Sequence, residues 1–187
     1  MSKGKLFVFS GASGVGKSTV LAKVMAERKD LRFSVSATTR APRPGEVDGE
    51  SYYFVTREQF EEMIARDEFI EYDAHMANYY GTPEAQLKEK LETGSVILDI
   101  EPVGAFNVRA KRSDAVLIFV APPSLEELER RLRSRGDTSE EQMQLRLERA
   151  RWEMEQSKKY DHIVVNDQVQ TCADKILHII AEHCGEE

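Results

Sequence analysis

The octapeptide GASGVGKS at residues 11–18 constrains this chain more than any other feature of its sequence. It matches the pattern G-x-x-x-x-G-K-[ST] and lies between an apolar run at residues 6–9 and a helical-looking segment at residues 19–28. Its glycines let the backbone turn tightly, so that several N–H groups point at a polyphosphate next to the positive end of the following helix. A plain Gly-rich turn would need neither Lys17 nor Ser18. The octapeptide therefore predicts a phosphate-binding loop for a nucleoside triphosphate.

The residue types in this loop have separate roles in phosphate binding. Lys17 would reach the outer phosphates, and the hydroxyl of Ser18 would bind Mg²⁺. We expect the loop and the start of the next helix to contact the triphosphate through Gly11, Ala12, Ser13, Gly14, Val15, Gly16, Lys17, Ser18 and Thr19.

Length and composition limit what surrounds the loop. With 187 residues, 41% of them hydrophobic, the chain can form one compact domain with a buried core and a small insert. A formal net charge of −7 argues against nucleic-acid or membrane partners, which would require a broad basic surface. No apolar run suits a signal peptide or a membrane span, so we expect a cytoplasmic protein in which Cys172 and Cys184 are reduced. The sequence leaves a monomer and a small homo-oligomer open.

Short apolar runs alternate with amphipathic segments, which is typical of an α/β fold with a parallel sheet covered by helices on both faces. The expected strands lie at residues 6–10, 33–35, 96–100, 116–120 and 163–165, and the later helices near 57–66, 83–93, 125–135, 140–159 and 171–183. Capping boxes mark three helix starts, at Thr56, Ser124 and Ser139. Thr82 precedes Pro83 and predicts a fourth N-cap.

Residues 36–82 depart from this alternation, because short aromatic runs joined by turns predict a small inserted antiparallel sheet. Arg40 and Arg43 could each make a two-pronged contact with a phosphate, and Tyr52 and Tyr80 could donate hydrogen bonds to it or pack against a base. A buried carboxylate such as Glu71 could accept from a ring N–H and an exocyclic amine, which guanine offers and adenine does not. The insert is therefore a candidate site for a nucleoside monophosphate.

Each of these residues also has an ordinary structural interpretation. Arginines near prolines are commonly solvated, tyrosines in short strands are commonly half-buried, and Glu71 could be an exposed strand residue. Only their combination opposite a phosphate loop favours a second nucleotide site.

The run SVSATTRAPRPGEVDGESYYF at residues 34–54 resembles the signature of guanylate kinases. The resemblance continues through residues 68–71, 78–82, 98–101, 121–124, 131–136 and 163–167, and covers nearly the whole chain. It implies a single domain with a P-loop kinase core, a mixed or antiparallel insert that binds the monophosphate, and a helical lid. The core would comprise residues 1–35, 83–125 and 160–187, the insert residues 36–82, and the lid about 126–159.

The resemblance also implies roles for individual residues. The phosphate of GMP would be held by Ser36, Arg40, Arg43, Tyr52 and Tyr80, and the guanine edge would be read by Glu71 and Thr82, with Asp99 facing both the base and the metal. On the ATP side, the resemblance implies phosphate contacts from Arg131, Arg135 and Arg146 and an adenine-side contact from Asn166. The implied reaction is Mg²⁺-dependent phosphoryl transfer from ATP to GMP, and to dGMP, in which Lys17, Arg40 and the lid arginines stabilise the moving charge.

Two parts of the sequence limit how far the roles implied by the resemblance can be assigned to this chain. Residues 100–104 read IEPVG, where family members carry an aspartate and then a glutamine nearby, so we expect altered affinity with activity retained. Arginines are plentiful between residues 130 and 151, and spacing alone does not choose among the seven: Arg130, Arg131, Arg133, Arg135, Arg146, Arg149 and Arg151. We expect this charged segment to close over ATP, with residues 136–138 as a flexible break.

Two rival functions remain at this point. One is an interaction module that has lost catalysis and binds phosphorylated peptides in the former GMP pocket, although such modules tend to have eroded phosphate loops. The other is a related kinase that acts on a different phosphorylated ribose or nucleotide.

Overall fold

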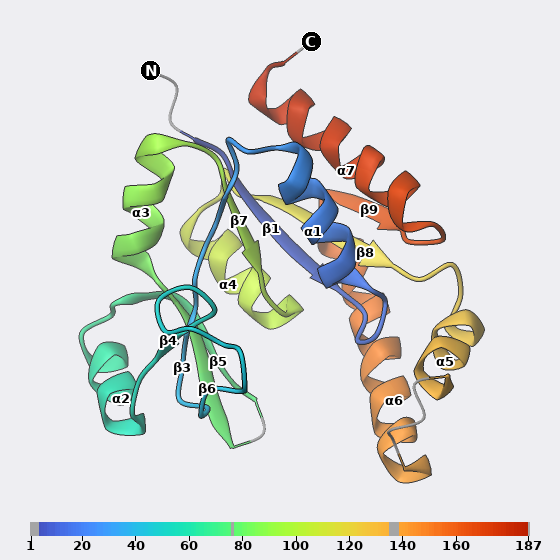
Figure 1. Ribbon diagram of the computed structural model, residues 1–187, viewed down its shortest axis with the longest axis horizontal. Helices are drawn as coiled ribbons and strands as arrows, with labels where there is room; N and C mark the ends of the chain where they lie inside the picture. Colours follow the sequence, from blue (N-terminus) through green and yellow to red (C-terminus); the bar gives the residue numbers. More distant parts are fainter. Residues whose placement is uncertain (1–3, 76, 135–138, 187) are drawn as a thin grey trace.

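The computed structural model describes residues 4–75, 77–134 and 139–186. Its main element is a five-stranded sheet in the order β2-β7-β1-β8-β9 (Figure 1), in which every neighbouring pair is parallel. The strands are β1 (Leu6–Gly11), β2 (Arg32–Phe33), β7 (Val96–Asp99), β8 (Val116–Ala121) and β9 (His162–Val165). The predicted α/β fold with a five-stranded parallel sheet is confirmed.

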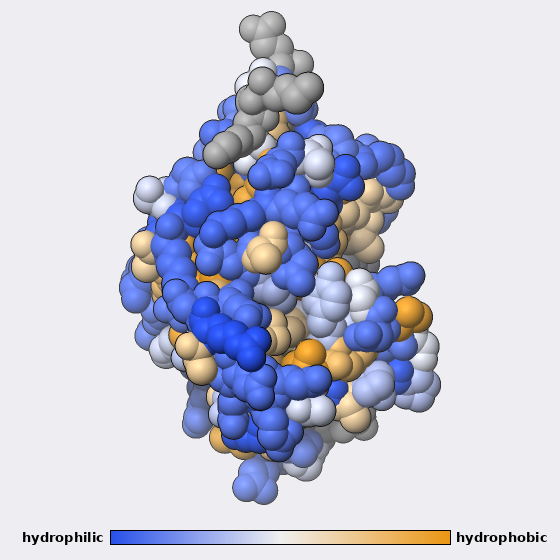
Figure 2. Space-filling model, turned by 90° about the vertical axis from the view of Figure 1, so that its left-hand side faces the viewer, coloured by the Kyte–Doolittle hydropathy of each residue, from blue (hydrophilic) through white to orange (hydrophobic). Residues whose placement is uncertain are grey.

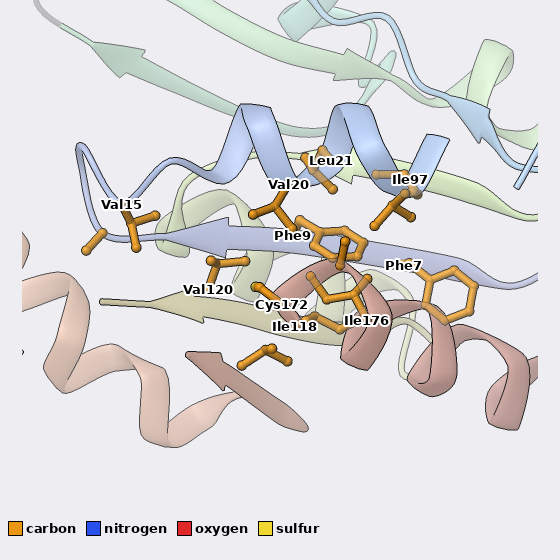
Figure 3. Packing of buried hydrophobic residues seen from close by; sticks show 14 of the residues in the cluster. Phe7, Phe9, Val15, Val20, Leu21, Ile97, Ile118, Val120, Cys172 and Ile176 are labelled. Carbon is orange, nitrogen blue, oxygen red and sulfur yellow. The ribbon is translucent and has the colours of Figure 1, made fainter. Parts of the chain in front are cut away.

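The central strand β1 is buried on both faces, as its continuous apolar run predicts. Phe7 and Phe9 point to one face and pack with α1 (Lys17–Glu27) and α7 (Val169–Cys184) (Figure 3). Leu6 and Val8 point to the other face and pack with α3 (Glu84–Thr93) and α4 (Pro102–Lys111). Successive strand residues alternate in direction, so one strand supplies both hydrophobic cores.

Helix α4 is absent from the sequence-based prediction, which treated Pro102 and Val103 only as departures from a family pattern. Pro102 is at the first helical position, where its missing N–H is no disadvantage, and Ala105 and Val108 are buried one turn apart. The buried apolar residues of this helix are small and interrupted by glycine, which weakens the periodic signal.

The predicted caps are confirmed at three helices and wrong at the fourth. Thr56 forms a full capping box with Gln59 at α2 (Arg57–Ala65). Ser124 and Ser139 accept the expected backbone hydrogen bonds at α5 (Leu125–Arg133) and α6 (Glu140–Gln156). Thr82 is not an N-cap, because it belongs to a strand and Pro83 precedes the first residue of α3.

The insert is a four-stranded mixed sheet in the order β4-β3-β6-β5. Its strands are β3 (Ala37–Thr38), β4 (Tyr53–Phe54), β5 (Phe69–His75) and β6 (Asn78–Pro83), and β3 and β4 are parallel whereas the other pairs are antiparallel. Helix α2 packs its Phe60 ring against Phe69 and Tyr79, at centroid distances of 4.4 and 5.2 Å. The neighbour of Phe69 in β5, Ile70, belongs instead to the main core with Leu87. Strand β5 therefore joins the insert to the main sheet.

Helices α5 and α6 lie on the opposite side of the carboxyl end of β1 from the insert (Figure 1). The buried residues of α6 are Met143, Leu147, Ala150 and Glu153, a stripe at helical spacing whose last member is charged. The predicted flexible break at residues 136–138 lies outside the described residues.

Within the described residues no helix is long and apolar enough to cross a membrane. The face shown in Figure 2 is mostly hydrophilic, with apolar residues scattered over it. Both cysteines are free, as expected, and Cys172 is buried.

Candidate active site

The predicted phosphate loop connects β1 to α1 through two glycines in the left-handed region, Gly14 with φ 87° and Gly16 with φ 90°. A Cβ on Gly14 would lie 2.5 Å from a methyl carbon of Leu132, so only glycine fits there. Val15 is 1% exposed and anchors the loop in the core, and its N–H donates to Ala12. Lys17 and Ser18 form the first turn of α1, where backbone N–H groups have no intrahelical acceptor. The loop thus presents free donors at a positive helix end.

The base of the loop is held by Asn166, directly after β9. Its side-chain Nδ2 donates to the carbonyl of Val15 at 2.8 Å, while its backbone carbonyl accepts from Arg131 at 3.0 Å. Its Oδ1 is buried without a hydrogen-bond partner among the described residues. Asn166 therefore has a structural role in the loop and one acceptor still available.

The cavity over the loop contains a residue that the sequence analysis did not identify. It is lined by residues 11–19 together with Ile100, Glu101 and Glu153. Glu153 comes from α6 and accepts the backbone N–H of Ser13 at 2.9 Å. The N–H of Ser13, predicted to contact the triphosphate, is already bonded to this carboxylate.

Lys17 extends from the loop to the end of β7, where it forms an ion pair with Asp99. Its side chain is 20% exposed. Burial lowers the pKa of Lys17 to about 8, and the negative charge of Glu153 acts in the opposite direction. Lys17 is thus a cation with an ionisation equilibrium close to physiological pH.

A second cavity, of about 250 Å³, lies between the loop and the insert. Its lining brings together predicted residues from distant parts of the sequence: Lys17, Ser36, Tyr52, Glu71, Tyr80 and Asp99, with Asp73, Gly81, Ile100, Glu101 and Gly104. Lys17, Ile100 and Glu101 also line the cavity over the phosphate loop. The two cavities meet at Lys17.

Glu71 lies at the inner wall of the second cavity and is 6% exposed. The hydroxyl of Thr82 donates a hydrogen bond to Glu71 Oε1 at 2.6 Å. Thr82 therefore binds this carboxylate and does not cap a helix as predicted. Burial raises the pKa of Glu71 to about 7, opposed by the hydrogen bond from Thr82 and assisted by the charge of Asp73. A Cβ on Gly104 would lie 2.6 Å from Glu71 Oε2, so the absence of a side chain there makes room for the carboxylate.

Arg40 is oriented by a carboxylate that the sequence analysis missed. Its two terminal nitrogens bind Glu46 at 2.9 and 2.8 Å, and its guanidinium lies 5.3 Å from the centre of the Tyr52 ring. The hydrogen bonds to Arg40 hold the pKa of Glu46 at about 2. Glu46 also accepts the backbone N–H of Arg43, whose side chain is exposed. Neither arginine lines the second cavity itself: Arg40 is ordered beside Tyr52, which does line it, and Arg43 is solvated.

The predicted lid arginines differ in their surroundings. Arg131 binds the carbonyl of Asn166 beneath the phosphate loop. Arg146 is half-buried and forms no hydrogen bond or ion pair with the described residues, and Arg135 lies outside them. Arg149, which spacing alone could not distinguish, forms ion pairs with Glu101 and Glu153 beside the loop.

The missed residues carried different signals. Glu153 continues the apolar stripe from Met143 to Ala150, at a position where helical periodicity predicts an apolar residue. A charged residue at such a position is a signal that the sequence contains. Asp73 is two residues from Glu71 in a strand and so shares its face. Gly104 and Glu46 had no comparable signal, because their roles depend on contacts that only folding brings together.

Comparison with known proteins shows the family to which the chain belongs. The family model described as guanylate kinase matches residues 3–183. The chain belongs to the guanylate kinase family. The guanylate kinase of Halalkalibacterium halodurans is 47% identical over 187 residues, which are 99% of this chain and 92% of that protein. The guanylate kinase of Lactococcus lactis is 49% identical over 183 residues, covering 97% and 89% of the two chains.

A solved structure shares the fold as well. The crystal structure of guanylate kinase from Anaplasma phagocytophilum superposes with a TM-score of 0.78 at 35% identity, covering 97% of this chain and 86% of that one. The α/β core and mixed insert are thus those of a guanylate kinase, and the enzyme is an ATP:GMP phosphotransferase of nucleotide metabolism.

Proposed function

We propose that this guanylate kinase moves the γ-phosphoryl group of ATP to GMP at the point where its two cavities meet, beside Lys17. The observation that carries the proposal is that Lys17 lines both cavities. One ammonium group can then neutralise charge on the phosphates of both nucleotides. Because phosphoryl transfer depends mainly on alignment and charge neutralisation, this position suits the reaction.

On the donor side, we assign the triphosphate to the cavity over the phosphate loop. The backbone donors are those at Gly14, Gly16, Lys17 and Ser18, whereas the N–H groups of Ser13 and Val15 are bonded within the protein. The other predicted contacts stay part of the proposal: Gly11, Ala12, Thr19, the lid residues Arg131, Arg135 and Arg146, and Asn166. The unpartnered Oδ1 of Asn166 is an acceptor that suits the exocyclic amine of adenine.

On the acceptor side, we assign GMP to the second cavity. The phosphate would lie against Ser36, Tyr52 and Tyr80 in the cavity lining and be reached by Arg40 and Arg43, and the guanine edge would lie against Glu71. An ionised Glu71 can accept from the ring N–H and the amine of guanine, while Thr82 holds it in place. None of these contacts involves a ribose 2′-hydroxyl, so dGMP is an acceptor too.

The acceptor is already an anion, and no residue has to remove a proton from it. The protein residues bind the two nucleotides, align them and neutralise the charge on their phosphates. Asp99 holds Lys17 at the meeting point of the cavities, and Arg40 is oriented by Glu46. Closure of the lid over ATP would exclude water as a competing acceptor.

The residues present suit Mg²⁺ as the cofactor. Ser18 offers a hydroxyl in the cavity over the phosphate loop, and Glu101 lines the same cavity with a carboxylate. Mg²⁺ prefers such hard oxygen ligands and usually takes only one or two from a protein, with phosphates and water completing its shell. When bound with ATP, the ion would neutralise charge on the outer phosphates.

The division of the chain into a core, an insert and a lid is also part of the proposal. We propose ATP and GMP as its substrates and the cytoplasm as its location. We propose no nucleic-acid or membrane partner, in keeping with the net charge of −7, and a monomer or small homo-oligomer.

An acceptor panel tests the proposal. GMP, dGMP, IMP and AMP are compared in an ATP-coupled assay, with the wild type and Glu71→Gln in parallel. We expect GMP and dGMP to be phosphorylated well by the wild type, IMP weakly and AMP barely. A Glu71→Gln variant that still prefers GMP over IMP by the wild-type factor would contradict the assignment of guanine to this carboxylate.

A further inference from the structure

The structure places a buried carboxylate beside the phosphate loop that none of the substrate contacts above uses. Glu153 is 2% exposed and follows the apolar residues Met143, Leu147 and Ala150 on the buried stripe of α6. A carboxylate in such a position loses its hydration, and an apolar side chain of similar size often serves stability as well or better. Packing alone does not account for a glutamate at this position.

Both oxygens of Glu153 are engaged, and the two partners come from different parts of the enzyme. Oε2 accepts the backbone N–H of Ser13 in the phosphate loop at 2.9 Å. Oε1 accepts from Nε of Arg149, one turn earlier on α6, at 3.2 Å. Arg149 in turn pairs with Glu101, which follows β7 and lines both cavities.

From these contacts we infer that Glu153 is a positioning residue for the phosphate loop. It holds Ser13 of the loop against helix α6, and Arg149 of the same helix orients its carboxylate. The loop must hold its free N–H groups in a fixed arrangement to bind a triphosphate. A charge-assisted hydrogen bond to Ser13 fixes the side of the loop that faces α6, whereas Asn166 fixes it at Val15. The loop is thus held from two elements, α6 and the end of β9.

Three variants test the hydrogen bond from Glu153 to the phosphate loop. Glu153→Gln keeps an oxygen acceptor for Ser13, Glu153→Ala removes it, and Glu155→Gln is the matched control at an exposed position of the same helix. Steady-state rates are measured with ATP varied at saturating GMP and with GMP varied at saturating ATP. Thermal unfolding of each variant reports on folding.

For Glu153→Gln we expect KM for ATP to stay within about threefold of the wild type, because the amide oxygen still accepts the N–H of Ser13. For Glu153→Ala we expect an increase of about tenfold in KM for ATP, because the Ser13 contact is lost. KM for GMP should stay within about twofold in both variants, a selectivity that a general loss of stability would not produce.

The inference is overturned if Glu153→Ala has the KM for ATP of Glu155→Gln, or if KM values for ATP and GMP rise together. Should Glu153→Ala fail to fold, Glu153→Met decides the question, because it fills the position with an apolar side chain of similar size that cannot accept from Ser13. Its KM for ATP should rise as in Glu153→Ala, and a wild-type KM for ATP in Glu153→Met would also contradict the inference.

Discussion

The carboxylate of Glu46 binds both terminal nitrogens of Arg40, at 2.8 and 2.9 Å, and so fixes the orientation of the guanidinium. The centre of the same guanidinium lies over the Tyr52 ring, 5.3 Å from its centroid, near the proposed site for the phosphate of GMP. Glu46 also holds the loop through the N–H of Arg43.

Glu46→Ala should therefore weaken GMP binding rather than improve it, since Arg40 and its loop lose their orientation. We expect KM for GMP to rise about tenfold while KM for ATP stays constant. Glu50→Ala, at an exposed position nearby, is the control. A lower KM for GMP in Glu46→Ala would mean that Glu46 competes with the phosphate for Arg40.

Lys17→Met should separate activity from stability. Turnover should fall by about two to three orders of magnitude, because a charge-stabilising group is removed from the transition state. Burial lowers the pKa of Lys17 from 10.5 to about 8, so the unfolded chain binds this proton more tightly than the folded protein does. In the wild type this group makes the folded state more stable as the pH rises from about 8 to 10.5. Lys17→Met should consequently unfold at the same or a higher temperature at pH 7, as measured by circular dichroism.

Thr82→Val should change the pH dependence of GMP binding. The raised pKa of Glu71, about 7, means that KM for GMP increases as the pH falls through that value and the carboxylate is protonated. Without the hydroxyl hydrogen bond the pKa rises further, so this increase should begin at a higher pH. Thr82→Ser retains a hydroxyl and should follow the wild type. The phosphate of GMP titrates near pH 6 in every variant alike, so a difference between Thr82→Val and Thr82→Ser reports on Glu71.

Gly104→Ala tests the space that Glu71 requires. The added methyl carbon would lie 2.6 Å from Glu71 Oε2, so the carboxylate has to move or the helix has to shift. We expect an increase of about tenfold or more in KM for GMP, with KM for ATP little changed. Val103→Ala, at an exposed position in the same helix, is the control. Equal KM values for GMP in the two variants would show that Glu71 does not depend on this glycine.

The sequence predicted most of the fold because its signals are local. An unbroken apolar β1, a glycine-rich loop with Lys17 and Ser18, and side-chain caps such as Thr56 each depend on neighbouring residues. Where a local signal allowed two roles for a side chain, its tertiary contacts determined which role it has. The Thr82 hydroxyl could serve as an N-cap or bind a carboxylate, and it donates to Glu71 because β6 continues to Pro83.

The site was predictable in part for the same reason. The cavity between the loop and the insert contains Lys17, Tyr52, Glu71, Tyr80 and Asp99, all of which a recognisable motif had marked. The carboxylates that orient the site were not predicted. Glu153 is 140 residues from Ser13 in sequence, and no local pattern indicates which backbone N–H a distant glutamate will accept.

Phe69 and Ile70 are consecutive in β5, yet the first packs in the aromatic cluster of the insert and the second in the main hydrophobic core. The two clusters are therefore connected by a single peptide unit at this point of the strand. If the insert rotates when a nucleotide arrives, the backbone between Phe69 and Ile70 has to accommodate that movement, because one residue belongs to each cluster. A change in volume at Phe69 or Ile70 would then alter the angle between the acceptor pocket and the phosphate loop without touching either nucleotide.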